Sequence, residues 1–94
     1  MNTDSPTYFK HPRAEKDYTI GWSDWLEGDT ITDSEWLVPS PLTLFSEAFT
    51  TTTATAWLSG GVMGQKYTVV NKITTASSPP RVEYRKIMIH CILQ

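Results

Sequence analysis

With 94 residues, a formal net charge of −2 and one cysteine, the chain is long enough for one domain and too short for two cores. The slightly acidic balance excludes a basic surface for phosphates, and no apolar run is long enough to cross a bilayer, so we expect neither a nucleic-acid nor a membrane partner. Cys91 has no second cysteine, which excludes an internal disulfide, and the absence of a signal-peptide pattern predicts folding in the cytoplasm.

Residues 1–16 contain two prolines and mixed charge, and they show no hydrophobic period. Such a segment has too little apolar area to offset the entropy lost on ordering. We therefore predict a flexible N-terminal arm over residues 1–16 and a folded domain over residues 17–94. Tyr8 and Phe9 leave a second interpretation open, in which the arm docks on a neighbouring subunit.

The next segment begins as a strand, because Tyr18, Ile20 and Trp22 fall on one face. Trp22 is therefore expected in the core. Residues 23–29 break the alternation and predict one helical turn, in which Ser23 is the cap and Gly28 is the left-handed end.

Residues 30–38 indicate a strand in two pieces, interrupted at residues 33–35, with Trp36 in the core. Prolines at positions 39 and 41 end that strand. Leu42, Leu44 and Phe49 belong to the next, weaker strand.

Residues 53–58 alternate strictly, so small apolar side chains share one face while Thr53, Thr55 and Trp57 share the other. Trp57 then stands on the outer face among threonines. An exposed tryptophan offers a large apolar area to a partner, so we predict a binding surface around Trp57, Thr53 and Thr55. Trp25, which lies in the break after residue 22, is the second tryptophan whose burial the pattern does not predict, so we predict it as a binding residue as well.

Three glycines within five residues, Gly60, Gly61 and Gly64, connect that strand to the next one. No Lys-Ser or Lys-Thr pair follows, so the pattern favours a hairpin turn over a phosphate-binding loop. Tyr67 follows Gly64 by three residues at the entrance to a strand, as in the tyrosine corner of immunoglobulin-like domains. We expect its ring to be buried and its hydroxyl to bond the backbone of the preceding turn.

The two remaining strands complete the fold. Residues 66–74 place Asn71 on the apolar face, where its amide needs a hydrogen-bond partner. Residues 82–93 direct Ile87, Ile89, Cys91 and Leu93 inward, so the thiol is expected to be buried and unreactive. The number and order of the predicted strands indicate an all-β fold, an immunoglobulin-like antiparallel β-sandwich of six to seven strands.

Nothing in the chain places a base beside a nucleophile, since the only histidines are His11 and His90. We therefore expect no enzymatic activity and no cofactor. A cluster of acids lacks the spacing of a calcium-binding loop and is typical of turns, so no metal site is predicted; it contains Asp24, Glu27, Asp29, Asp33 and Glu35.

Over residues 10–92 the chain resembles a family of small tailed-phage virion proteins described as fiber–tail adaptor proteins. Four ordered motifs carry the resemblance: Asp17-Tyr18-Thr19-Ile20, Gly28-Asp29-Thr30-Ile31, Trp57-Leu58-Ser59-Gly60-Gly61 and Tyr67-Thr68-Val69. The chain departs from the family at residues 77–80, where it has Ser-Ser-Pro-Pro in place of a glycine-containing turn.

The resemblance implies an immunoglobulin-like structural protein of the virion tail or neck, assembled in the host cytoplasm. Its partners would be other virion proteins of the tail, neck or fiber, and it would act as a homo-oligomer without cofactor or catalysis. Two alternatives remain at this point. One is a carbohydrate-binding module that uses Trp57 and Trp25 as stacking platforms, and the other is a capsid decoration protein.

Overall fold

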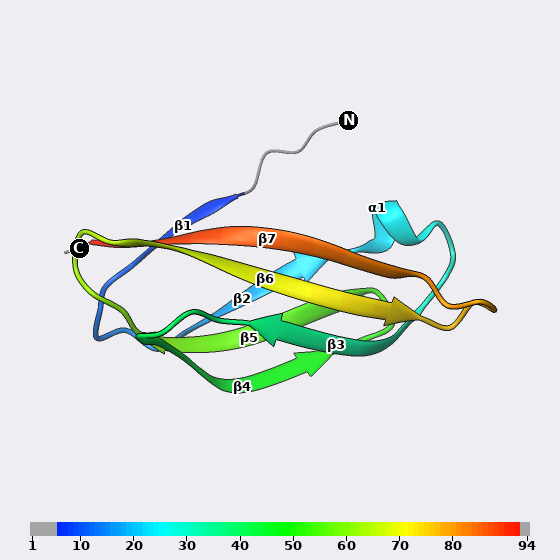
Figure 1. Cartoon of the computed structure of the whole chain (residues 1–94), viewed down its shortest axis with the longest axis horizontal. Coiled ribbons are helices and arrows are strands. Elements are labelled where there is room, and N and C mark those ends of the chain that lie inside the picture. Colours follow the sequence, from blue (N-terminus) through cyan, green and yellow to red (C-terminus); the bar gives the residue numbers. More distant parts are fainter. Residues whose placement is uncertain (1–5, 93–94) are drawn as a thin grey trace.

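The computed structural model describes residues 6–92 (Figure 1). Seven strands and one short helix follow in the order β1 (Thr7–Lys10), β2 (Lys16–Gly21), α1 (Ser23–Leu26), β3 (Ile31–Leu37), β4 (Leu42–Phe49), β5 (Thr53–Gly60), β6 (Lys66–Thr75) and β7 (Val82–Cys91). This part of the chain contains no helix that is long and apolar enough to span a membrane.

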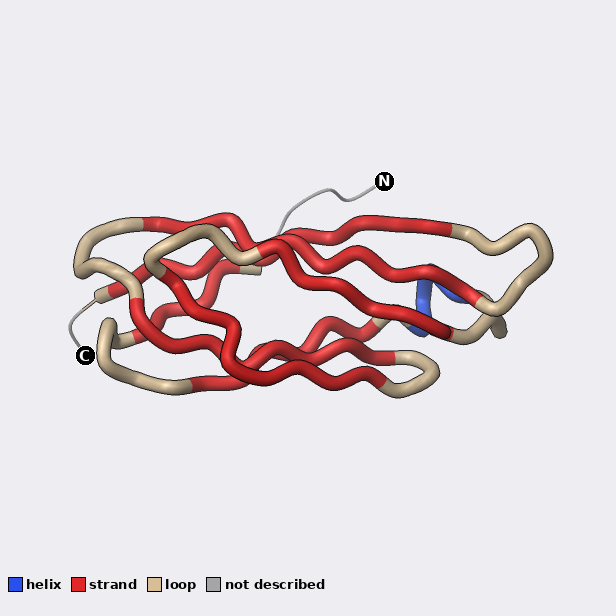
Figure 2. Tube along the Cα trace, turned by 60° about the horizontal axis from the view of Figure 1, so that its bottom comes forward, coloured by secondary structure: helices blue, strands red, loops and turns tan. Residues whose placement is uncertain are grey.

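The strands form two sheets that pack face to face as a β-sandwich (Figure 2). The four-stranded sheet has the order β1-β7-β6-β3, and the three-stranded sheet has the order β2-β5-β4. Apart from β1, which runs parallel to β7, all neighbours in the described sheets are antiparallel. The separation of β2-β5-β4 from β7-β6-β3 is consistent with the predicted immunoglobulin-like arrangement.

The core lies between the sheets because alternate side chains of each strand point inward. On β5 the fully buried residues are Ala54, Ala56 and Leu58, as the alternation predicts. On β7, Ile87, Ile89 and Cys91 are buried, which confirms the predicted register. Leu93, the last inward position predicted, lies outside the described residues. Trp22 is fully buried, and Trp36 is 8% exposed.

The N-terminal part of the fold differs from the prediction of an arm over residues 1–16. Residues 7–10 form β1, which pairs with Met88–Cys91, and β2 already begins at Lys16. The Lys10 side chain is completely buried, and its ammonium donates to the carbonyl oxygens of His11, Pro12 and Gly60 at 3.0, 3.4 and 2.6 Å. Three carbonyls can hold a buried ammonium, so a lysine is compatible with the end of this strand.

Three local predictions need correction. The glycine-rich segment after β5 is no hairpin turn, because β5 and β6 lie in different sheets and the segment crosses between them. The residue that caps α1 is Trp22, with no side-chain cap bond, and the left-handed conformation begins at Glu27 (φ 50°) before Gly28 (φ 95°). β3 is one strand whose register shifts between Ile31 and Asp33.

Candidate functional site

The predicted binding surface lies on the outer face of the three-stranded sheet, on its central strand. Thr53, Thr55 and Trp57 alternate along β5 with the buried residues and are each half-buried. Trp57 is opposite Asp17 on β2 and Ser46 on β4. We call this surface, centred on Trp57 and flanked by Thr53, Thr55, Asp17 and Ser46, the Trp57 face.

The side chains opposite Trp57 and Thr55 on this sheet are short, whereas Phe45, the residue before Ser46 on β4, is large and exposed. Thr55 is opposite Thr19 on β2 and Ala48 on β4, and the two threonine hydroxyls lie 2.8 Å apart in a hydrogen bond. At the start of β5, the backbone N–H of Thr53 donates to the Thr50 hydroxyl over 3.0 Å. Among the five residues that define the Trp57 face, the indole is the large apolar group that can be offered to a partner.

Trp25 does not join the Trp57 face. It lies in α1, after the Gly21 end of β2, whereas Trp57 is opposite Asp17 near the start of that strand. Its ring packs edge-on against Trp22 with 5.7 Å between the centroids, and the Arg81 guanidinium lies 4.3 Å from its centroid. These contacts make Trp25 a half-buried part of the α1 packing.

Two of the acidic residues near α1 bind arginines. The Arg85 guanidinium donates to both carboxylate oxygens of Asp24 at 3.3 Å, and Arg81 lies 3.3 Å from Asp29. The hydrogen bond from Arg85 lowers the pKa of Asp24. In residues 6–92 no group of three or more His, Cys, Asp or Glu side chains is arranged to hold a metal ion.

The connection between β5 and β6 contains the predicted tyrosine corner. The Tyr67 ring packs against the core but is half-buried, not buried as predicted, because it lies at the end of the sandwich. Its hydroxyl accepts the predicted backbone hydrogen bond, 3.0 Å from the N–H of Val62. Gly60, Gly61 and Gly64 have positive φ angles of 83°, 104° and 85°. A side chain at Gly60 would lie 2.8 Å from the Pro41 carbonyl oxygen, and one at Gly61 would meet the Cys91 sulfur. The glycines therefore allow the chain to turn closely against its neighbours.

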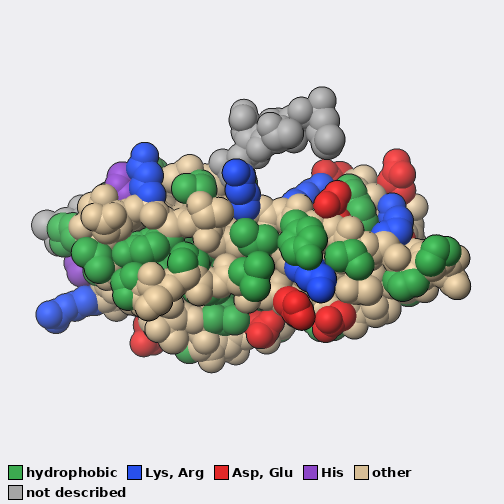
Figure 3. Space-filling model, in the orientation of Figure 1, with side chains coloured by type: hydrophobic (Ala, Val, Ile, Leu, Met, Phe, Trp, Pro, Cys, Tyr) green, Lys and Arg blue, Asp and Glu red, His purple; other side chains and the backbone are tan. Residues whose placement is uncertain are grey.

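Sequence reasoning missed two sets of exposed apolar side chains. On β4, Phe45 is the extra residue at a bulge and is 48% exposed, and Phe49 is 43% exposed. The only signal is the apolar pair at residues 44 and 45, which breaks the alternation. On the other sheet, hydrophobic side chains lie among lysines and acids across the face seen in Figure 3. The exposed apolar residues of these strands are Phe9, Leu37, Val82 and Tyr84.

The geometry defines a class of protein: a small all-β sandwich whose distinctive exposed features are apolar and aromatic surfaces. Comparison with protein families then identifies the family. A family model described as podophage GP4 fiber-tail adaptor protein gp77 matches residues 10–90. The chain belongs to this family, which makes it a structural phage protein and a component of the virion. A comparison with curated protein sequences gives no match.

Proposed function

We propose that this protein joins tail and fiber proteins of the virion by direct protein–protein contact, and that the Trp57 face is one of its docking surfaces. The observation that carries the proposal is the position of Trp57 on an outer sheet face, where it is half-buried and opposite the short side chains of Asp17 and Ser46. Family membership supports the class of partner, since an adaptor of this kind interacts with other tail or fiber proteins.

Binding through such a face depends on a few anchors. A large aromatic side chain at the centre of an interface often contributes about 2 kcal/mol or more, while its smaller neighbours mainly exclude water. In the proposal several copies of the chain act together in the virion, so that contacts which are modest for one copy add up through multivalency. Thr53 and Thr55 supply hydroxyls next to the anchor.

The alternative of a carbohydrate-binding module has less support. It requires exposed aromatic platforms, and the Trp25 ring is occupied by Arg81 on its face and by Trp22 at its edge. Trp57 then remains as a single platform. A capsid decoration protein would use the same docking chemistry, but the family match favours the tail.

The test supplies the Trp57→Ala variant to a phage from which the gene for this protein has been deleted. We expect incorporation of the Trp57→Ala variant into tails to fall about tenfold or more, because an anchor of about 2 kcal/mol is lost. The melting temperature of the purified variant should change little, since the indole is only half-buried. Incorporation is measured by quantitative mass spectrometry of purified virions.

The matched control is Leu37→Ala, which removes an exposed apolar side chain (56% exposed) from the other sheet. It should leave incorporation near the wild-type level, which separates the Trp57 face from a general loss of apolar surface. A Trp57→Ala variant that unfolds at a much lower temperature, yet whose folded fraction assembles normally, would make Trp57 a structural residue and refute the proposal.

A further inference from the structure

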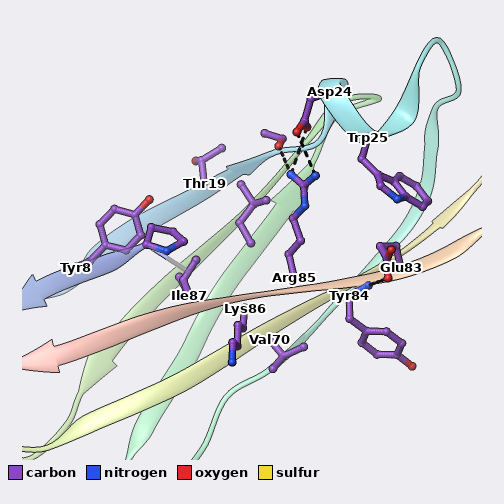
Figure 4. A pocket seen from close by; sticks show the side chains of 13 residues that line it. Tyr8, Thr19, Asp24, Trp25, Val70, Glu83, Tyr84, Arg85, Lys86 and Ile87 are labelled. Atoms are coloured by element: carbon purple, nitrogen blue, oxygen red, sulfur yellow. Dashed lines mark hydrogen bonds and ion pairs between the residues drawn. The ribbon is translucent and has the colours of Figure 1, made fainter. Parts of the chain in front are cut away.

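A groove of about 890 Å³ lies at one side of the sandwich, where β7 of one sheet approaches β2 of the other (Figure 4). Thr19, Ile20 and Gly21 of β2 line it on one side, and residues 83–87 of β7 line it on the other. Pro6 and Tyr8 of the N-terminal segment also line it, together with Trp25 of α1. The groove borders the Trp57 face, because Thr19 is hydrogen-bonded to Thr55 and Gly21 is opposite Thr53, but β7 belongs to the other sheet.

Among residues 6–92, no strand pairs with the edge of β7 that borders this groove over residues 82–87. β1 pairs only with Met88–Cys91, although β7 begins at Val82. The Met88 N–H donates to the Pro6 carbonyl over 2.9 Å, so even-numbered residues direct their backbone groups toward the β1 side. The backbone groups of Tyr84 and Lys86 therefore point to the open edge.

A side chain already covers one of these donors. The carboxylate of Glu83 accepts a hydrogen bond of 3.0 Å from the Tyr84 N–H. A carboxylate on a flexible side chain protects an edge donor without committing it to a ladder, and an incoming strand can replace it. The edge of β7 is thus covered by a group that can move away.

The chemistry of the groove indicates what fits there. Ile20, Ile87 and Tyr8 supply apolar walls, and Arg85 points toward α1, where its charge is balanced by Asp24 (Figure 4). The interior thus accepts uncharged apolar side chains at alternate positions of an extended chain. On the outer side, Lys86 is exposed and has no ion pair among residues 6–92. An acidic side chain is its electrostatic complement.

We propose that the open edge of β7 binds an extended segment of a second virion protein, which adds as a strand next to residues 82–86 in line with β1. The segment places apolar side chains at alternate positions into the groove and an acidic side chain beside Lys86. The main-chain hydrogen bonds provide affinity, and the groove provides specificity. The identity of the partner as a virion protein rests on the proposed function, whereas the binding edge does not involve the Trp57 face.

The first experiment removes an outward donor without changing the ladder to β6. Tyr84→Pro deletes the N–H that points to the open edge, and Tyr84→Val is its matched control because it loses the ring and keeps the N–H. We expect incorporation into tails to fall about tenfold for the proline variant, because it loses the edge hydrogen bond and weakens the adjacent one. Incorporation of the valine variant should change little.

A second variant acts at the open edge without a proline and guards against a proline variant that fails to fold. Lys86→Glu reverses the exposed charge beside the open edge, so it should repel the acidic side chain of the segment and lower incorporation about tenfold. Lys66→Glu makes the same charge change at an exposed residue of β6 and should assemble normally. Folded Lys86→Glu or Tyr84→Pro protein that enters tails at the wild-type level would overturn the inference.

Hydrogen exchange identifies the occupant. In the free protein the amides of Tyr84 and Lys86 should exchange rapidly, and in assembled tails their exchange should slow by at least about tenfold. Protection in the free protein that disappears when residues 1–5 are removed would assign the edge to the chain's own N-terminus. Protection that disappears on dilution would assign the edge to a second copy of the chain. Either result overturns the proposal. If Trp57→Ala fails to assemble while both edge variants assemble normally, only the groove inference is lost.

Discussion

The indole N–H of Trp22 donates a hydrogen bond of 3.0 Å to the side-chain oxygen of Asn71, and both residues are fully buried between the sheets. The Asn71 amide nitrogen in turn donates to the Ser34 hydroxyl at 3.0 Å and to the Glu35 carbonyl at 2.9 Å. Asn71 therefore connects β3, β6 and the tryptophan that precedes α1. Its amide is buried without an energetic penalty because each polar atom is bonded.

Replacing Asn71 by leucine should destabilise the protein by about 2–3 kcal/mol, because the Trp22 N–H and the Glu35 carbonyl are left without their partner. Urea denaturation followed by tryptophan fluorescence measures the change. Ser34→Ala is the control, since it removes one half-buried partner and should cost only about 1 kcal/mol. Equal stability of Asn71→Leu and the wild type would show that this network contributes nothing.

Tyr67→Phe tests the tyrosine corner. The N–H of Val62, which bonds the Tyr67 hydroxyl, is exposed, so water can replace the lost acceptor. We therefore expect a loss of about 0.5–1.5 kcal/mol in thermal or urea unfolding, which is less than for a fully buried bond. A loss of about 3 kcal/mol would mean that the turn shields this bond from water after all.

Gly61→Ala and Gly64→Ala form a matched pair in the same turn. Both glycines have positive φ, so alanine at either position should cost about 1–2 kcal/mol of backbone strain. At Gly61 the added methyl group would also meet the buried sulfur of Cys91, while at Gly64 the space is open. Gly61→Ala should be the more destabilising by a further 1–3 kcal/mol or so. Equal melting temperatures of the two variants would contradict this packing.

Tyr18 should make stability depend on alkaline pH. Burial raises its pKa to about 12 from the ordinary value of 10.0, because the folded protein disfavours the phenolate. Below pH 10 both states are neutral and this contribution is fully present. Between pH 10 and 12 only the unfolded chain ionises, so stability falls by up to about 1.4 kcal/mol per pH unit.

The comparison with Tyr18→Phe isolates that contribution, because other groups also titrate in this range. The Tyr18 hydroxyl is buried and has no hydrogen-bond partner among residues 6–92, so its removal should leave stability at pH 7 unchanged or slightly increased. If the stability difference between the two proteins does not change between pH 9 and 12, the hydroxyl is not shielded from solvent.

Alternation allowed most of the sandwich to be predicted from sequence. The inward rows of β5 and β7 and the outward position of Trp57 follow directly from a period of two residues, since each of these strands has one buried face. The need of Asn71 for a partner followed from the same rule, because an amide in an apolar row has to be bonded.

Features that depend on contacts between distant segments could not be predicted in this way. β1 is not predicted because residues 1–16 contain two prolines and mixed charge without a hydrophobic period, and only the fold brings the Gly60 carbonyl, fifty residues away, to the Lys10 ammonium. The glycine turn was assigned to a hairpin because local sequence does not tell whether two consecutive strands share a sheet. The groove beside β7 was missed for a related reason, since an open edge depends on where another strand ends.

The burial of Lys10 has a consequence for proteolysis. Trypsin must take the lysine side chain into its own pocket, and the Lys10 ammonium is held by three carbonyls, so cleavage there requires the end of the sandwich to open. Arg13, three residues later in the turn before β2, is exposed and can be cut while the sheets stay closed. A chain nicked at Arg13 would keep β1 in place as a separate peptide, held by its hydrogen bonds to β7, by the buried lysine and by the packing of Tyr8 and Phe9 against Tyr18 and His90.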